Sequence, residues 1–213
     1  MSSLVASERN VYERAHQFLA GCGWFALIVG GGLGLVFGLY AHQQSGLLDP
    51  SYLKEIFSHV LLGRLPTVLV AAFVLLRVNF QMATDHTFEH VWTQARHSLT
   101  YVVACGVTCM LAWMWFFLAV LIGSWLGMMQ SHAGFGQGVW EAYWGEFEFQ
   151  YWLHAGLRML LLAAALSGLT YFEIKLLKSH QNWDSHMMSR SMTVGMVIIV
   201  GIEVLDLLWQ LHA

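Results

Sequence analysis

Five long apolar runs, each bounded by polar residues, dominate the chain and restrict its fold more than any other feature. A helix needs about 20 apolar residues to cross about 30 Å of hydrocarbon. Lipid offers no hydrogen-bond partner to the backbone, so a spanning segment must satisfy its own amides, and the runs are predicted to be helices. We expect an all-α integral membrane protein, a bundle of about five transmembrane helices in one polytopic domain over residues 1–213. The runs cover residues 18–41, 56–77, 98–127, 151–176 and 191–211.

The composition agrees with a chain solvated by the lipid bilayer. Apolar residues make up 57% of the chain and charged residues 11%, whereas a soluble domain carries about 25% charged residues. The net charge of −3 and the absence of a basic run predict no nucleic-acid partner. All three cysteines fall within or beside the runs, so no disulfide framework is expected. Cys105 and Cys109 share a helix face, where they act either as small apolar side chains or as thiolate ligands of a metal site.

The basic residues predict the orientation in the membrane. Cytoplasmic loops carry an excess of Lys and Arg, and the basic residues alternate from loop to loop as five spans require. The N-terminus is therefore predicted to be cytoplasmic and the C-terminus to lie outside. Together with the compact loops, this favours a multi-pass protein of a bacterial inner membrane. The basic residues on the cytoplasmic side are Arg9, Arg14, Arg77, Arg96, Lys175, Lys178 and Arg190.

A shift of 94 residues aligns the second and third runs with the fourth and fifth. Shared apolar residues carry little weight in membrane sequences, so the polar and aromatic matches matter most. These are Arg64/Arg158, His86/His180, Arg96/Arg190 and Trp115/Trp209. One interpretation is a duplicated two-helix hairpin, as in some transporters. The other is two hairpins that resemble each other because membranes restrict composition.

Charged residues inside the runs are candidates for an intramembrane ion pair or relay. Arg64 and Arg158 lie about a third of the way into their runs, and Pro66 is expected to interrupt the second run beside Arg64. An arginine in the bilayer normally faces the bundle and pairs. Glu203 and Asp206 share a helix face at a matching depth, and His154 precedes Arg158 by one turn. Arg158 with either acid is the predicted pair. It either fixes helix packing or, with His154, passes protons or ions.

Small residues in the first run predict a close helix contact. Gly30 and Gly34 form a G-x-x-x-G face that Gly38 extends by one turn. This face predicts close packing against a helix of the same chain or of another subunit.

The histidines suggest two further sites. A divalent metal site on the cytoplasmic side is one hypothesis, and haem b ligation by paired histidines is another. Otherwise these side chains are solvated or capping residues, and no cofactor is expected. The metal candidates are His86, Glu89, His90, His180 and His186, and the haem candidates are His59, His97 and His154.

Three functions remain open. The small size, the short loops and the glycine face favour a non-enzymatic subunit of a larger membrane assembly of the secretion, conjugation or respiratory type. A belt of aromatic residues predicted at the outer membrane boundary favours it as well: Trp140, Tyr143, Trp144, Phe147, Tyr151 and Trp152. Other membrane subunits are then expected partners. The alternatives are a haem b or metal-binding electron-transfer anchor and a small proton- or ion-coupled transporter.

Overall fold

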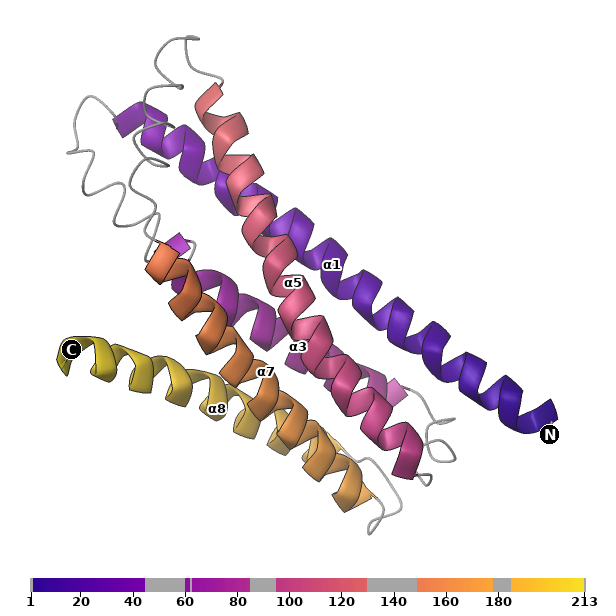
Figure 1. The fold of residues 1–213 in the computed structure, drawn as a ribbon. Helices are drawn as coiled ribbons and strands as arrows, with labels where there is room; N and C mark the ends of the chain where they lie inside the picture. Colours follow the sequence, from indigo (N-terminus) through magenta and orange to yellow (C-terminus); the bar gives the residue numbers. More distant parts are fainter. Residues whose placement is uncertain are drawn as a thin grey trace. The chain divides into compact units, whose positions relative to one another are not determined.

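The computed structural model describes residues 2–44, 60–61, 63–84, 95–129, 149–177 and 185–212. Within these ranges the chain forms five helices and no strand (Figure 1). Four of them contain stretches long and apolar enough to cross a membrane, which confirms the all-α membrane fold class. The helices are α1 (Ser2–Gln44), α3 (Leu65–Thr84), α5 (Ala95–Met129), α7 (Phe149–Leu177) and α8 (Ser185–His212), and the stretches are Ala20–Ala41, Val102–Met129, Trp152–Glu173 and Met188–Trp209.

Helix α3 differs from the other four. Its apolar stretch, Leu65–Phe80, is shorter than the roughly 20 residues that a helix needs to cross the hydrocarbon core. Residues 60, 61, 63 and 64 form a π-helical turn just before it. Pro66 therefore lies in the first turn of α3, where proline is tolerated because that amide has no helical acceptor. The expected interruption beside Arg64 lies at this change from π-helix to α-helix.

The described chain divides into two compact units, which we treat separately. The glycine unit consists of Gly23–Val70 and Ala112–Arg158. The five-helix unit consists of Met1–Cys22, Ala71–Leu111 and Met159–Ala213, and so takes a segment from each helix.

In the glycine unit, α1 and α5 touch backbone to backbone. A Cβ atom at Gly34 would collide with the carbonyl of Val120, and one at Gly38 would collide with the carbonyl of Ser124. The contact is reciprocal, because a Cβ at Gly123 of α5 would collide with the carbonyl of Gly31. The predicted glycine face, including the buried Gly30, is thus a packing surface within the chain.

Helices α5 and α7 meet through aromatic rings in the same unit. Trp113 lies 6.1 Å from Trp152 between ring centroids and 6.2 Å from Phe117. Phe117 and Trp152 meet edge to face at 6.5 Å. Aromatic pairs at such distances add to the energy of area burial, so this trio strengthens the α5–α7 contact.

In the five-helix unit, close approaches connect each helix to a neighbour. Gly195 of α8 faces the side chain of Leu75 in α3, and Gly106 of α5 faces the Ser167 hydroxyl of α7. Gly21 of α1 lies under the guanidinium of Arg77. The apolar core contains fully buried side chains from three helices: Val74 and Val78 of α3, Met159, Leu162 and Leu166 of α7, and Ile199 of α8.

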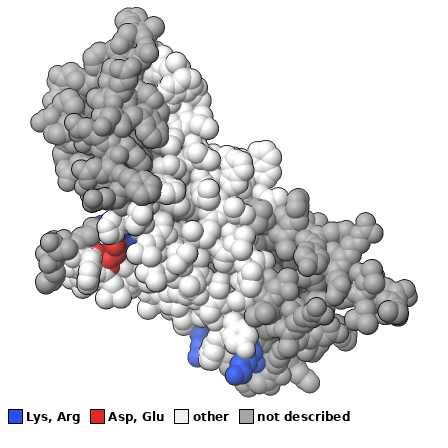
Figure 2. Space-filling view, in the orientation of Figure 1, with Lys and Arg blue, Asp and Glu red and all other residues white. Residues whose placement is uncertain are grey.

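The outward surface is apolar, as a lipid-facing surface requires. In Figure 2 most of the described surface carries neither Lys or Arg nor Asp or Glu. Large side chains such as Val103, Leu160 and Val197 are more than half exposed. An aqueous surface would not leave so many apolar side chains uncovered, so the described helices support an integral multi-pass membrane protein in contact with the bilayer.

Candidate functional site

Arg158 is buried in the glycine unit and reaches a segment far away in the sequence. Its Nη2 donates a hydrogen bond of 3.1 Å to the carbonyl of Gly63, in the turn that precedes α3. Only 6% of the residue is exposed. The carbonyl of Arg64, the next residue in that turn, accepts a bond of 2.7 Å from the Thr67 hydroxyl. The Arg158 side chain and the Arg64 backbone therefore both form hydrogen bonds at the point where the chain enters α3.

The two acids of α8 continue the inner face of that helix. Ser191, Gly195 and Ile199 are buried and spaced by four residues. Glu203 continues this row, and Asp206 lies one turn further on; both are partly exposed. The predicted pairing of these acids with Arg158 stays a prediction. His154 is exposed although Arg158, one turn later, is buried, so a relay through His154 also stays a prediction.

Most histidine candidates lie outside the described residues. These are His59, His86, Glu89, His90 and His180. His97 and His186 belong to α5 and α8, but their side chains are not among those described. Within the described residues, no group of three or more His, Cys, Asp or Glu side chains is placed to hold a metal ion. The haem and metal hypotheses remain predictions, to be tested by a Soret band and by metal analysis of the purified protein.

The three thiols gather in the five-helix unit. Cys22, Cys105 and Cys109 are free and buried. The thiols of Cys105 and Cys109 interact across one helical turn, and Cys22 of α1 lies within electrostatic reach of both. The Thr170 hydroxyl of α7 donates to the Leu166 carbonyl at 2.8 Å, and its oxygen lies 4.0 Å from the Cys105 sulfur. The shared face predicted for Cys105 and Cys109 is thus inside the bundle.

A second polar group of the five-helix unit was not predicted from the sequence. Asn79 of α3, Glu173 of α7 and Ser191 of α8 are exposed by 0%, 6% and 3%. The Ser191 hydroxyl faces the Glu173 carboxyl. Asn79 Oδ1, Glu173 Oε1 and Ser191 Oγ have no hydrogen-bond partner among the described residues. We call these three residues the three-oxygen site.

One signal in the sequence points to this site. Glu173 falls inside the apolar run 151–176, where an acid is costly and usually functional. Asn79 and Ser191 lack such a signal, because a polar residue at the end of a span normally reaches the headgroups. Their burial depends on which helices cross there.

Comparisons with protein-family models, with curated proteins and with solved structures return no match. The class of protein defined by the fold is a polytopic α-helical membrane protein. Any narrower function has to be argued from the residues described above.

Proposed function

We propose that the protein is a non-enzymatic membrane subunit of a larger multiprotein assembly, in which a transmembrane helix of another subunit packs against the outer face of α8. Assemblies of the secretion, conjugation or respiratory type in a bacterial inner membrane fit a chain with four helices long and apolar enough to span the membrane. The observation that carries the proposal is the uneven burial of the four spanning stretches.

Helix α8 is covered much less than the other three. The most apolar window of α8 is 17% buried, compared with 33% for α1, 44% for α5 and 39% for α7. Its inner face uses Ser191, Gly195 and Ile199. Large exposed side chains such as Val197, Val200 and Leu205 lie on other faces of α8, where they can meet lipid or another helix.

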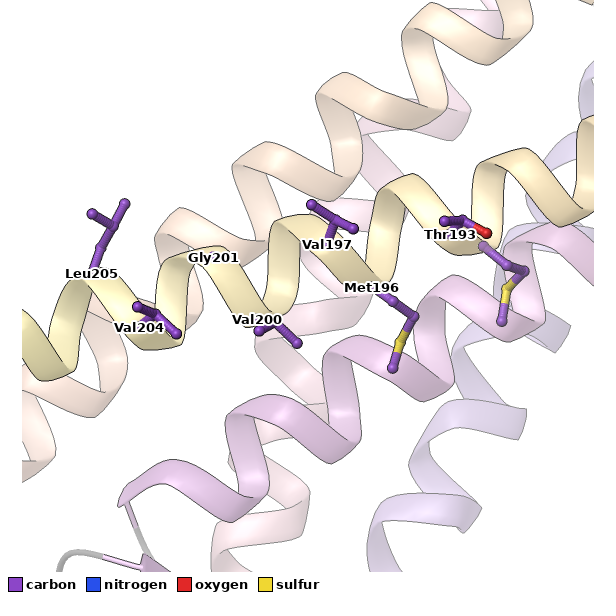
Figure 3. Close-up of a pocket in the computed structure, with 8 residues that line it drawn as sticks. Thr193, Met196, Val197, Val200, Gly201, Val204 and Leu205 are labelled. Atoms are coloured by element: carbon purple, nitrogen blue, oxygen red, sulfur yellow. The ribbon is translucent and has the colours of Figure 1, made fainter.

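The outer face of α8 has the relief that helix packing uses. An open groove of about 830 Å³ runs along it between two rows of side chains spaced by four residues. Figure 3 shows Thr193, Val197 and Leu205 on one side of the helix and Met196, Val200 and Val204 on the other. Rows at this spacing form ridges, and a neighbouring helix packs into the groove between them. Gly201 lies in the groove with open space around its Cα, which allows a close approach.

The chemistry of the groove predicts an apolar occupant. None of its eight lining residues is charged, and the Thr193 hydroxyl is already bonded to the carbonyl of Ser189 at 2.8 Å. A partner helix therefore needs an apolar, close-fitting face and no charge at this level. Lipid chains are the competing occupant, because apolar side chains gain little from leaving lipid unless the fit is good.

The test is the native mass of the tagged full-length protein, extracted gently from its own membrane. We expect a particle much larger than the 24.0 kDa chain. Val197→Phe places a large ring in the groove and should reduce the particle to the free chain. A lipid-facing valine tolerates the same change, so Val103→Phe is the matched control; Val103 is 57% exposed on α5 and Val197 is 66% exposed on α8.

Two results would contradict the proposal. One is a wild-type protein that migrates as a monomer or as a homo-oligomer. The other is a particle that survives Val197→Phe unchanged, which would mean that lipid fills the groove. Both variants should be checked for normal insertion, so that loss of the particle is not loss of the fold.

Ion-coupled transport is a second candidate function, favoured by the buried Glu173 of the five-helix unit. An ionisable residue inside a membrane helix is a common mark of an ion or proton pathway. Glu173→Gln should then abolish uptake by reconstituted vesicles while the variant folds normally. The sequence-based relay predicts the same for Glu203→Gln, so the two variants separate the two routes.

A further inference from the structure

Glu173 is a buried carboxyl group that has no ion-pair partner in the part of the chain that the structure describes. It is 6% exposed. Burying an ionised carboxylate alone in an apolar environment is so costly that such a group is paired, bound to a cation or neutralised. The groups around Glu173 indicate whether its carboxyl group is paired, bound to a cation or protonated.

Two more buried oxygens without a hydrogen-bond partner lie on the neighbouring helices α3 and α8. Leu75 of α3 contacts Gly195 of α8, and these helix segments run in opposite directions (Figure 1). One turn beyond Leu75 is Asn79, and one turn before Gly195 is Ser191. Because the two helices are antiparallel, both steps go in the same direction along the bundle. Asn79 and Ser191 therefore lie at the same height along the two helices. Ser191 in turn faces the Glu173 carboxyl from α8.

Three buried oxygens of the site lack a hydrogen-bond partner among the described residues. The Asn79 amide nitrogen donates to the Leu75 carbonyl at 2.9 Å, which leaves its oxygen without a partner. Glu173 Oε1 and Ser191 Oγ are without one as well. The nearest cation on α3, Arg77, is two residues from Asn79 and lies against Gly21 of α1, on a different face of the helix. A carboxylate oxygen, an amide oxygen and a hydroxyl oxygen are ligands that hard cations prefer.

We propose that Asn79, Glu173 and Ser191 form an intramembrane binding site for a monovalent alkali cation, with Na⁺ as its representative. One carboxylate and one monovalent cation leave the site neutral, whereas a divalent cation would leave a buried positive charge. The proposal does not depend on the assembly function, since it concerns the inner face of α8 and the groove lies on the outer face.

The experiment is thermal unfolding of the full-length protein in detergent micelles at constant ionic strength, with NaCl replacing choline chloride. A cation that binds only the folded state raises the Tm progressively with concentration. We expect Na⁺ to raise the Tm and choline to have no effect, with LiCl and KCl reporting the size preference. Glu173→Gln should abolish the Na⁺ response. Ser191→Ala should raise the Na⁺ concentration needed by roughly tenfold, as changes around metal sites commonly do.

The matched control is Ser189→Ala, which removes an exposed hydroxyl from the same helix two residues away. It should keep the wild-type response to Na⁺. If Glu173→Gln fails to fold, Ser191→Ala carries the test. Equal Tm values in Na⁺ and choline would overturn the proposal, as would a Na⁺ response that survives unchanged in Ser191→Ala. A Tm that depends on pH but not on Na⁺ would also overturn it, because Glu173 would then hold a proton.

Discussion

Gly34 of α1 lies against the carbonyl of Val120 in α5, with no space between them for a methyl group. Gly127 of α5 completes the contact from the other side, because a Cβ there would meet the carbonyl of Leu35 at 2.6 Å. Close approach of this kind replaces the hydrophobic effect, which does not drive association between helices in lipid. The small-residue face therefore stabilises the glycine unit.

The first prediction concerns this contact. Gly34→Leu should separate α1 from α5 and lower the free energy of unfolding by at least about 1–3 kcal/mol, the usual cost of overpacking. Gly32→Leu is the control, because Gly32 is exposed and a Cβ added there would have no atom within 4 Å. Unfolding by denaturant in mixed micelles measures both. Equal losses would show that the contact is not specific to Gly34.

A second prediction uses the contact between Gly195 and Leu75. Gly195→Ala places a methyl group against the buried Leu75 side chain and should destabilise the protein by about 1–3 kcal/mol. Leu75→Ala in the same chain should recover part of that loss, because the space it vacates accepts the methyl group. A double-mutant cycle measures this coupling.

Gly201→Ala serves as the control for that cycle, since Gly201 faces open space. Its effect should be close to neutral in the isolated protein and independent of Leu75→Ala. Additive losses for Gly195→Ala and Leu75→Ala would mean that the two side chains do not touch.

The contrast between Gly34 and Glu173 shows how far the sequence predicts this molecule. Glycines spaced by four residues in an apolar run lie on one face of a helix, so the sequence alone predicts that packing face. Only the identity of the opposite helix needed the structure. Glu173 also falls inside its apolar run, where an acid is costly, but the run does not show which side chains surround the carboxyl group. The burial of Glu173 depends on how α8 packs against α7, and no local sequence pattern predicts that packing.

Helix α3 shows the same limit at its ends. The apolar run 56–77 stops before Asn79, yet α3 continues to Thr84, so Asn79 becomes a buried helical residue. Pro66 was expected to interrupt the span, and it lies where the π-helical turn gives way to the α-helix. Apolar runs locate helices well, but their ends depend on capping and on neighbours.

A third prediction tests the sequence-based ion pair. Arg158→Leu removes the donor to the Gly63 carbonyl, which costs about 1–3 kcal/mol when a buried acceptor loses its partner. If Glu203 or Asp206 also pairs with Arg158, the loss should rise to about 3–5 kcal/mol, because an unpaired charge is left inside the membrane. Adding Glu203→Gln and Asp206→Asn should then restore stability. Simple additivity in thermal denaturation would refute the pairing.

The fourth prediction concerns the three thiols. Cys22, Cys105 and Cys109 are exposed by 0–1%, and a buried thiol in apolar surroundings is unreactive. The folded protein in detergent should therefore resist N-ethylmaleimide, as measured by intact mass, and should take up three labels only after denaturation. Ser189→Cys provides an exposed thiol on α8 and should react at once. Labelling of a native cysteine at the rate of the introduced one would show that the interior of the five-helix unit opens to solvent, and the three-oxygen site beside it would then be hydrated.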